Sequence, residues 1–270
     1  MSAITASRAL NTPDVVAPTT LARVRAAVER TGYVPNLIAG GLASNRSRLI
    51  AAVVPTIAGP VFLETIQALT ETLADAGLQL MLGQSGYDGT REDALLDAIV
   101  ARRPDGIVLT GLMQSADGRR KLLASGIPVV ETWDLTPTPI DMLVGFSHEA
   151  VGVAAADFLF ERGRRSVAIV TADDHRAGLR RSGFEARWRS LAGAGAQAVP
   201  CRVVGAPSSL ANGRLALQDL LAEHPDLDAV FCSSDVLAHG VLTQAHATGI
   251  AVPERISVLG FGDLAFAAHT

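Results

Sequence analysis

From residue 49 onward the chain alternates short apolar runs with longer stretches whose apolar residues recur at helical spacing. The first apolar run is residues 49–55, and the stretch after it places Phe62, Ile66, Leu69 and Leu73 on one helical face before Gly77 ends it. Strands as apolar as these, joined by helices, indicate a parallel sheet that is covered on both faces. The alternation therefore predicts an α/β fold.

This alternation occurs twice along the chain. The expected strands are residues 49–55, 78–82, 106–109, 128–132 and 142–145 in the first set, and 166–170, 198–204, 229–232 and 256–259 in the second. An expected helix at residues 149–162 crosses from one set to the other, and a further helix is expected at residues 179–191. We therefore predict two doubly wound parallel-sheet lobes, residues 49–146 and 147–270, with a cleft between them.

The two ends of the chain carry opposite charge. Residues 1–48 hold six arginines against Asp14 and Glu29, a net charge of +4, whereas the whole chain carries −4, so that residues 49–270 carry −8. A basic N-terminal segment ahead of an acidic body predicts that the segment meets a polyanion such as nucleic acid, while the body has another task.

Composition limits the class of protein. Of the 270 residues, 49% are apolar and 19% are charged, which allows a substantial core and argues against disorder. No apolar run is long enough to span a bilayer, and the N-terminus lacks the apolar region of a signal peptide. Cys201 and Cys232, both on expected strands, are predicted to be buried thiols in a reducing compartment. We therefore expect a cytoplasmic protein with no membrane partner.

Two short helices are expected before the body, at residues 2–10 and 19–30, with Gly32 as a stop after the second. Residues 37–42 also have helical spacing, but two adjacent glycines within them each cost about 1 kcal/mol relative to Ala. A helix this short is not stable alone in water. We expect it to become ordered only when it docks on a partner.

Five short segments resemble the LacI/GalR family of bacterial transcription regulators. They are Ser-Arg-Ala-Leu-Asn at 7–11, Thr-Leu-Ala-Arg-Val at 20–24, Gly-Tyr-Val-Pro-Asn at 32–36, Leu-Ala at 42–43 and Gly-Phe-Gly-Asp at 260–263. The resemblance covers nearly the whole chain, and it implies a body similar to periplasmic sugar-binding proteins of type I. Within the family, residues 36–48 and 131–135 are most similar to the gluconate-repressor (GntR-like) branch.

The resemblance implies a partial helix-turn-helix DNA-binding headpiece at residues 1–32 and a hinge at residues 33–48. In this family the headpiece reads the major groove, and paired hinges of a homodimer enter the minor groove, where the residue at Leu42 wedges between base pairs. The alternative for Leu42 is a contact with the surface of the body. The residues placed against operator DNA are Ser2, Ala3, Ile4, Thr5, Ser7, Arg8 and Asn11 in the headpiece, and Asn36, Ala39, Leu42 and Ala43 in the hinge.

Compared with the family pattern, the chain begins after the first headpiece helix and ends before the last strands of the body. We therefore expect a headpiece that lacks part of its packing, and a cleft that lacks part of its wall.

Ligands of parallel sheets bind beyond the carboxyl ends of the strands. The loops expected there carry arginines at 176, 180 and 181, which can hold a carboxylate, together with aspartates and aromatic side chains. This mixture predicts a small carbohydrate or sugar-acid (gluconate-like) effector. The candidate effector-binding residues are Phe62, Trp133, Asp134, Arg176, Arg180, Ser234, Asp235 and Asp263.

The resemblance distinguishes some of these candidates. Arg180 matches an arginine that holds the effector in many members, and Phe62 matches an aromatic residue of the cleft; the alternatives are a surface charge and a core residue. Ser234 stands where the family has an effector-binding asparagine, which puts its role in question. His148, beside the expected helix cap Ser147, is predicted to be structural rather than ligand-binding.

No catalytic arrangement is evident in the sequence. No Gly-x-Gly-x-x-Gly opens a helix, no Gly-x-Ser-x-Gly is present, and Asp-Asp-His at 173–175 lacks a second cluster of metal ligands. We therefore expect no enzyme activity, no cofactor and no metal. The predicted function is a transcription repressor that binds operator DNA as a homodimer under the control of its effector. The alternative is a free-standing sugar-binding protein without DNA-binding activity.

Overall fold

The computed structural model describes residues 1–34, 46–87, 91–193 and 197–270. The chain divides into two compact units, Met1–Ser47 and Arg48–Thr270. Four hinge residues that the sequence places against DNA lie outside the described residues: Asn36, Ala39, Leu42 and Ala43.

The N-terminal unit contains helix α1 (Ala3–Asn11), the short 3₁₀ helix η1 (Pro13–Val15) and helix α2 (Pro18–Thr31). Both expected helices are confirmed, with each end within one residue of the prediction. Helix α2 ends where Gly32 adopts a left-handed conformation with φ of 62°, as the sequence predicted.

Packing within this unit is sparse. Among its described residues, only Ala9 on α1 and Val24 on α2 are buried apolar side chains. The expected apolar stripe of α2 therefore packs against a small core.

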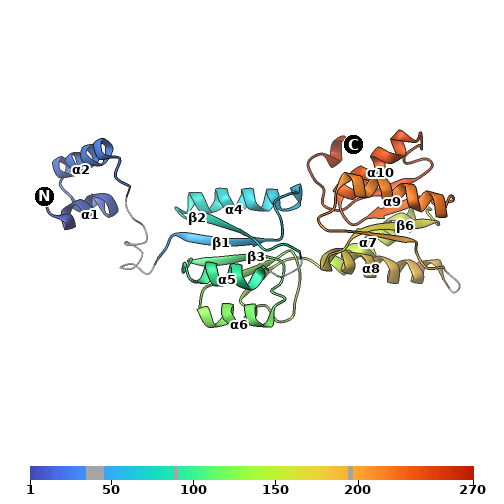
Figure 1. Ribbon diagram of the computed structural model, residues 1–270, viewed down its shortest axis with the longest axis horizontal. Coiled ribbons are helices and arrows are strands. Elements are labelled where there is room, and N and C mark those ends of the chain that lie inside the picture. The colour runs from blue at the N-terminus through green and yellow to red at the C-terminus, as the bar shows by residue number, and fades with distance from the viewer. Residues whose placement is uncertain (35–45, 88–90, 194–196) are drawn as a thin grey trace. The chain divides into compact units, whose positions relative to one another are not determined.

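The first lobe of the second unit contains a five-stranded sheet in the order β2-β1-β3-β4-β5, with every neighbouring pair parallel. Figure 1 shows α4 on one face of this sheet and α5 and α6 on the other. The elements are β1 (Leu49–Val54), η2 (Pro60–Phe62), α4 (Leu63–Asp75), β2 (Gln79–Gln84), α5 (Glu92–Val100), β3 (Gly106–Thr110), α6 (Ala116–Ser125), β4 (Val129–Thr132) and β5 (Met142–Val144).

The second lobe contains a four-stranded parallel sheet in the order β7-β6-β8-β9, again with helices on both faces, α7 and α8 on one and α9 and α10 on the other (Figure 1). The elements are α7 (His148–Glu161), β6 (Val167–Ala172), α8 (His175–Ala192), β7 (Cys201–Val204), α9 (Leu210–Glu223), β8 (Ala229–Cys232), α10 (Asp235–Ala247), β9 (Ser257–Leu259) and η3 (Ala267–His269). The predicted fold of two doubly wound lobes is confirmed.

Two element boundaries differ from the sequence prediction by more than two residues. Helix α8 begins at His175, four residues before the expected start at Leu179, because the side chain of Asp174 accepts the N–H of Ala177 and caps the helix there. Strand β7 begins at Cys201, three residues after the expected start at Ala198, and its first paired residue is Cys201 opposite Ile169.

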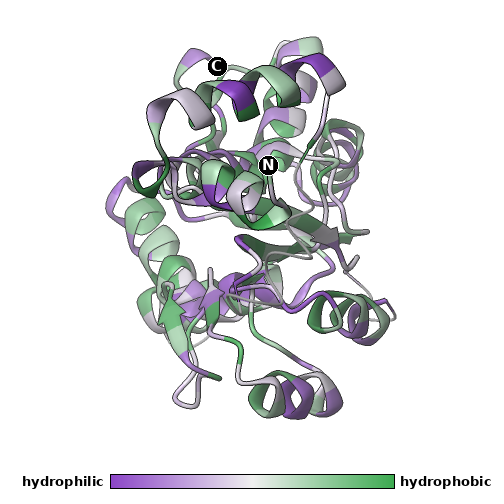
Figure 2. Ribbon diagram, turned by 90° about the vertical axis from the view of Figure 1, so that its left-hand side faces the viewer, coloured by the Kyte–Doolittle hydropathy of each residue, from purple (hydrophilic) through white to green (hydrophobic). Residues whose placement is uncertain are grey.

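The strands supply the cores of both lobes. In Figure 2 the strands at the centre are largely green, or hydrophobic, whereas the surrounding helices carry purple, hydrophilic stretches. Every residue of β6 and of β8 is buried, as expected for strands covered on both faces. Cys232 on β8 is a fully buried free thiol whose pKa is raised by burial, and Cys201 on β7 is a half-buried free thiol.

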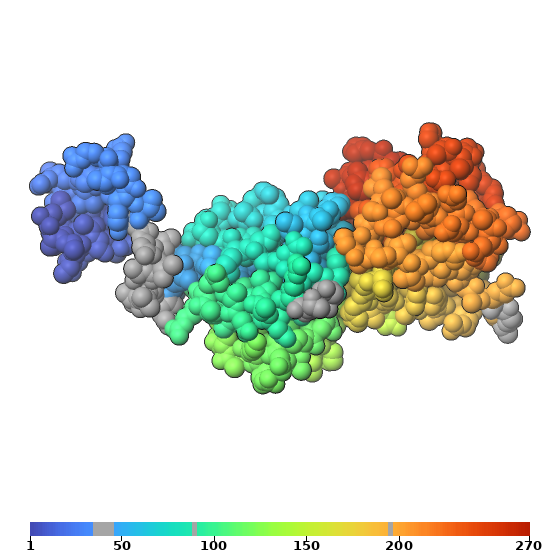
Figure 3. Space-filling view, in the orientation of Figure 1, coloured from blue at the N-terminus to red at the C-terminus, as the bar shows by residue number. Residues whose placement is uncertain are grey.

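The two lobes of the second unit adjoin along a band where the blue-green atoms of the first lobe meet the yellow and orange atoms of the second (Figure 3). The chain passes from the first lobe to the second between β5 and α7. Within the described residues, none of the helices combines the length and the apolar character that crossing a bilayer requires.

Candidate functional site

Each sheet has a point at which the winding direction reverses, between β1 and β3 in the first lobe and between β6 and β8 in the second. Crevices at such switch points, beyond the carboxyl ends of the strands, are where doubly wound sheets bind ligands. The loops that leave these strands carry the polar side chains of the candidate site.

A cavity enclosing about 670 Å³, including its open mouth, lies at these loops and is lined by both lobes. We call it the arginine pocket, because two arginines of α8 lie in its wall. Its side-chain lining includes Val61, Phe62, Tyr87 and Trp133 from the first lobe, and His148, Asp174, Arg176, Arg180, Ser208, Ser233, Ser234, Phe261 and Leu264 from the second.

Arg180 is the more enclosed of these two arginines. Its side chain belongs to a residue that is 6% exposed, and its Nη1 donates a hydrogen bond of 2.7 Å to Nδ1 of His148. The guanidinium carbon lies 4.3 Å from the centre of the Phe261 ring. Its Nε is buried and has no hydrogen-bond partner among the described residues. Burial lowers the pKa of Arg180 to about 10, so the side chain remains a cation at neutral pH.

Arg176 lies one helical turn earlier on α8. Its Nη1 donates to the carbonyl of Thr110 at the end of β3, 3.4 Å away, so this arginine of the second lobe reaches the first. The guanidinium carbon lies 5.1 Å from the centre of the Phe62 ring, and burial lowers the pKa of the side chain. Among the described residues, no carboxylate oxygen lies within 4.0 Å of a nitrogen of Arg176 or Arg180. Both cations therefore lack an ion-pair partner within the described chain.

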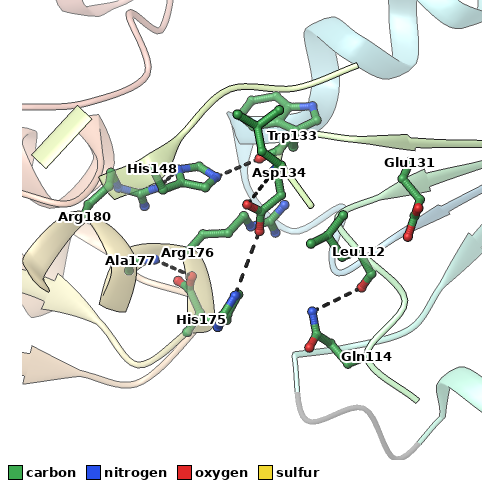
Figure 4. A network of polar contacts seen from close by, with 12 residues as sticks. Leu112, Gln114, Glu131, Trp133, Asp134, His148, His175, Arg176, Ala177 and Arg180 are labelled. Carbon is green, nitrogen blue, oxygen red and sulfur yellow. Dashed lines mark hydrogen bonds and ion pairs between the residues drawn. The ribbon is translucent and has the colours of Figure 1, made fainter. Parts of the chain in front are cut away.

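His148 bridges the two lobes at the back of this pocket. Its Nε2 lies 2.7 Å from the carbonyl oxygen of Trp133, and its Nδ1 lies 2.7 Å from Nη1 of Arg180 (Figure 4). Because an arginine can only donate, Nδ1 is the acceptor and Nε2 carries the proton that is donated to Trp133. Burial, followed by the charge of Arg180, lowers the pKa of His148 to about 4, which keeps the ring neutral.

Helices α7 and α8 pack at backbone contact, which brings His148 and Arg180 together. A Cβ placed on Gly152 of α7 would lie 2.0 Å from the carbonyl oxygen of Arg180. A Cβ placed on Gly183 of α8 would lie 2.2 Å from the carbonyl oxygen of Glu149. Only glycine fits at either position, and the resulting close approach sets the distance between the two side chains.

A second cavity of about 940 Å³ shares Tyr87, Asp174 and Arg176 with the arginine pocket and extends over the ends of β1 and β3. Its wall is acidic. Asp134, which is 5% exposed, accepts the N–H of Leu135 with Oδ1, while its Oδ2 lies 4.0 Å from Nε2 of His175. The pKa of Glu92 is raised, chiefly by burial and further by Asp93. Asp134 and Glu92 thus make this cavity more acidic than the arginine pocket, although Arg176 lines both.

The predicted effector residues divide among three cavities. Phe62, Trp133, Arg176, Arg180 and Ser234 line the arginine pocket, and Asp134 lines the acidic cavity. Asp235 and Asp263 line neither; together with Trp133, Phe146 and Phe261 they border a third, more open hollow of about 990 Å³.

Two charged residues that the sequence placed at the cleft, Asp235 and Arg181, contact other protein groups instead. Asp235 is buried, and its Oδ2 accepts the N–H of Leu264 at 2.8 Å, so its carboxylate fixes the loop after β9. Arg181, which the sequence grouped with the other arginines of α8, lines none of the three cavities; its Nε lies 3.6 Å from Glu185. Helical geometry explains this, because Arg181 is one residue, or about 100°, from Arg180.

Several pocket residues were absent from the candidate set: Tyr87, His148, Asp174, Ser208, Ser233 and Phe261. Most lie on loops that the strand pattern had placed at the cleft, so the loops were predicted but the inward-facing residues within them were not. His148 was predicted to be structural, and the structure places it in the pocket wall with both ring nitrogens engaged by protein groups.

In the N-terminal unit, the candidate DNA-contacting residues lie on and just before α1. Ser2, Ala3, Ile4, Ser7, Arg8 and Asn11 are exposed, and Thr5 is partly exposed. The Ser2 side chain accepts the N–H of Thr5, which caps α1, and Asn11 Nδ2 donates to the carbonyl of Ser7. Ile4 is 66% exposed.

Residues 47–270 match the family of periplasmic binding proteins and sugar-binding domains of the LacI family, so the chain belongs to the LacI-family transcription regulators. It is similar to the HTH-type transcriptional regulator GntR of Pseudomonas aeruginosa, with 40% identity over 266 residues, which are 98% of this chain and 77% of that protein. This similarity agrees with the GntR-like branch that the sequence segments indicated.

Solved structures support the same assignment. A LacI-family transcriptional regulator from Silicibacter pomeroyi superposes with a TM-score of 0.92 at 34% identity, covering 100% of this chain and 81% of that one. The transcriptional regulator CelR in complex with cellobiose superposes with a TM-score of 0.69 at 26% identity, covering 98% and 80% of the two chains. The chain is therefore a DNA-binding transcription regulator with a sugar-binding type of body.

Proposed function

We propose that this regulator is a repressor that binds operator DNA as a homodimer and senses a small sugar acid, of the gluconate type, held in the arginine pocket. Both lobes line the pocket, so a ligand there contacts both at once. In this proposal the protein works in the cytoplasm, catalyses no reaction and uses no cofactor.

The observation that carries the ligand class is a pair of guanidinium groups, Arg180 buried and Arg176 partly buried, without a carboxylate partner among the described residues. Removing a cation from water is costly unless an anion or several acceptors compensate. The planar fork of an arginine pairs well with a carboxylate. A ligand carboxylate between Arg176 and Arg180 would supply the missing anion.

The rest of the pocket suits the polyhydroxy part of such a ligand. Trp133 and Phe62 offer apolar ring faces, with ring centres 5.3 Å apart at an interplanar angle of 75°. Ser208 and Ser234, whose hydroxyl oxygens lie 3.3 Å apart, can donate to and accept from ligand hydroxyls. The cellobiose held by CelR is a carbohydrate in a regulator of similar fold, which supports a ligand of this general type.

The proposed DNA contacts lie in the N-terminal unit and the hinge. The alignment with the GntR regulator covers 266 of the 270 residues, so nearly all of the N-terminal unit is included. Its exposed α1 positions and its positive charge suit DNA. This similarity favours a regulator over a free-standing sugar-binding protein.

Isothermal titration calorimetry of the purified protein tests the ligand class. We expect gluconate to bind and neutral glucose to bind at least tenfold more weakly. Arg180→Gln should abolish measurable gluconate binding, whereas Arg181→Gln, which changes the neighbouring arginine on the same helix outside the pocket, should leave it intact. Equal binding of glucose and gluconate, or equal losses in the two variants, would overturn the proposed ligand class.

A gel-shift experiment tests the regulatory role. The DNA upstream of the protein's own gene is mixed with the wild type, with and without gluconate at saturating concentration. We expect a protein–DNA complex whose affinity falls at least fivefold when gluconate is added, in line with typical coupling free energies of about 1–3 kcal/mol. A gluconate-independent complex would contradict the control by this ligand.

A further inference from the structure

We propose that His148 is a positioning residue that holds Arg180 ready for the ligand carboxylate and ties it to the first lobe through the carbonyl of Trp133. This inference rests on the proposed function, because it assigns a role to the residue behind the proposed carboxylate-binding arginine.

Its two hydrogen bonds require His148 to accept from Arg180 and to donate to the carbonyl of Trp133. Arg180 cannot accept a hydrogen bond and the Trp133 carbonyl cannot donate one. The neutral ring with its proton on Nε2 is the form that satisfies both contacts, each of 2.7 Å. His148 is 1% exposed, so bulk solvent does not compete for either ring nitrogen.

Arg180 depends on His148 for its orientation. Among the described residues, the guanidinium of Arg180 has one hydrogen bond, which it donates to His148. Its Nε is buried and has no hydrogen-bond partner among those residues. The Phe261 ring covers one face of the guanidinium at 4.3 Å, which restricts its tilt but not its rotation within the ring plane. The bond to Nδ1 of His148 fixes that rotation and leaves the remaining nitrogen atoms for a ligand.

The ring of His148 is itself held in place by aromatic neighbours. Its centre lies 4.7 Å from the centre of Phe146 and 6.1 Å from that of Phe261, with both pairs in edge-to-face geometry. Phe146 belongs to the segment between β5 and α7 that joins the lobes. A rigidly held ring can transmit a displacement of one hydrogen-bond partner to the other.

On the first lobe, His148 contacts the backbone of Trp133, whose conformation is restricted. Trp133 follows β4, has a positive φ of 67° that few residues other than glycine adopt, and its N–H donates to the carbonyl of Val144. The same residue presents its side chain to the arginine pocket. A shift of the first lobe therefore moves the Trp133 carbonyl and its indole together, and His148 connects that shift to Arg180 (Figure 4).

Two substitutions separate the halves of the bridge. In His148→Asn, the side-chain oxygen occupies roughly the position of Nδ1, so it can still accept from Arg180 but no longer reaches Trp133. In His148→Gln, the amide nitrogen lies near the position of Nε2, so it can still donate to Trp133 but leaves Arg180 without its acceptor. A purely structural role predicts similar thermal destabilisation in both variants and unchanged ligand affinity per folded molecule.

The experiment combines calorimetry with gluconate and nitrogen NMR of histidine-labelled, ligand-free protein. We expect the His148 signals, assigned by their loss in His148→Asn, to report a neutral ring protonated on Nε2 at pH 7. We expect gluconate affinity to fall at least tenfold in His148→Gln and less than threefold in His148→Asn.

The outcomes separate the inference from the proposed function. A ring protonated on Nδ1, or equal gluconate affinity in the wild type and His148→Gln, overturns the positioning role. If the wild type fails to bind gluconate, the proposed ligand class is wrong. The NMR spectrum of the ligand-free protein then tests the two hydrogen bonds of His148 by itself: protonation on Nε2 supports them, and protonation on Nδ1 contradicts them.

Discussion

The carbonyl oxygen of Arg180 on α8 occupies the space that a side chain at Gly152 on α7 would need. A Cβ at that position would lie 2.0 Å from the oxygen, well inside van der Waals contact. The backbone of the helix that carries the proposed ligand-binding arginine is thus pressed directly on α7, whose first residue is His148. Any change in this packing displaces both ends of the His148–Arg180 hydrogen bond.

We predict that Gly152→Ala destabilises the protein by about 1–3 kcal/mol, because α7 and α8 must separate to admit the methyl group. The separation should also weaken gluconate binding, since Arg180 moves away from His148. Urea unfolding and calorimetry measure the two effects.

Gly178→Ala is the matched control for this substitution. Gly178 lies on the same helix α8, and a Cβ there meets no atom within 4 Å. Alanine favours a helix by about 1 kcal/mol over glycine. The control should therefore be neutral or slightly stabilising, with unchanged gluconate affinity. If Gly152→Ala behaved like this control, the packing argument would be wrong.

The fold could be predicted because its signals are local. Apolar runs located all nine strands found in the described part of the body, and Gly32 and Gly77 marked helix ends that the structure confirms with φ of 62° and 71°. The start of α8 was misplaced because Asp174 lies in a polar stretch, Asp-Asp-His, in which either aspartate could cap a helix. Which of the two does so depends on the preceding loop.

The site could be predicted only in part, because it is assembled from distant segments. Loop positions followed from strand ends, and the resemblance to regulators singled out Arg180. The bridge through His148 required the approach of α7 to α8 at Gly152 and the position of Trp133, and no local pattern contains either distance.

We predict that Asp174→Asn strengthens gluconate binding by a few-fold. Asp174 lines the arginine pocket, and its negative charge acts on both Arg176 and Arg180. Removing one negative charge near a bound carboxylate lowers the repulsion by about 1 kcal/mol or less in a partly hydrated site. Asparagine also caps helices, so the N–H of Ala177 keeps an acceptor and α8 keeps its start.

Calorimetry at two salt concentrations checks this prediction, with Asp173→Asn as the control. Asp173 is an exposed neighbour outside the pocket lining, so the same loss of charge there should have little effect. The gain in Asp174→Asn should shrink as salt is added. Weaker binding in Asp174→Asn would mean instead that the carboxylate itself accepts hydrogen bonds from the ligand.

We predict that Leu42→Ala weakens binding to specific operator DNA at least tenfold and leaves non-specific binding nearly unchanged. The prediction follows from the family resemblance of the hinge, in which an apolar side chain inserted between base pairs stabilises a bent duplex. Non-specific binding depends on phosphate contacts, to which leucine contributes nothing. Operators selected from random DNA by the wild type serve for the measurement, and equal losses on both kinds of DNA would favour a contact of Leu42 with the body.

We predict that His148 makes the folding stability fall as the pH drops below neutrality. The pKa of His148 is lowered from 6.5 to about 4 in the folded protein, by burial and by the charges of Arg180 and Arg176, against the opposing effects of Asp134 and the Trp133 carbonyl. The unfolded chain therefore binds a proton between these values that the folded protein does not, so the stability rises with pH across this window. Between pH 7.5 and 5 the effect amounts to about 1–2 kcal/mol. Urea unfolding at both values should show this loss in the wild type and a smaller one in His148→Asn, whose side chain does not titrate; a His148 that titrates near 6.5 in the folded protein would give equal losses in the two proteins.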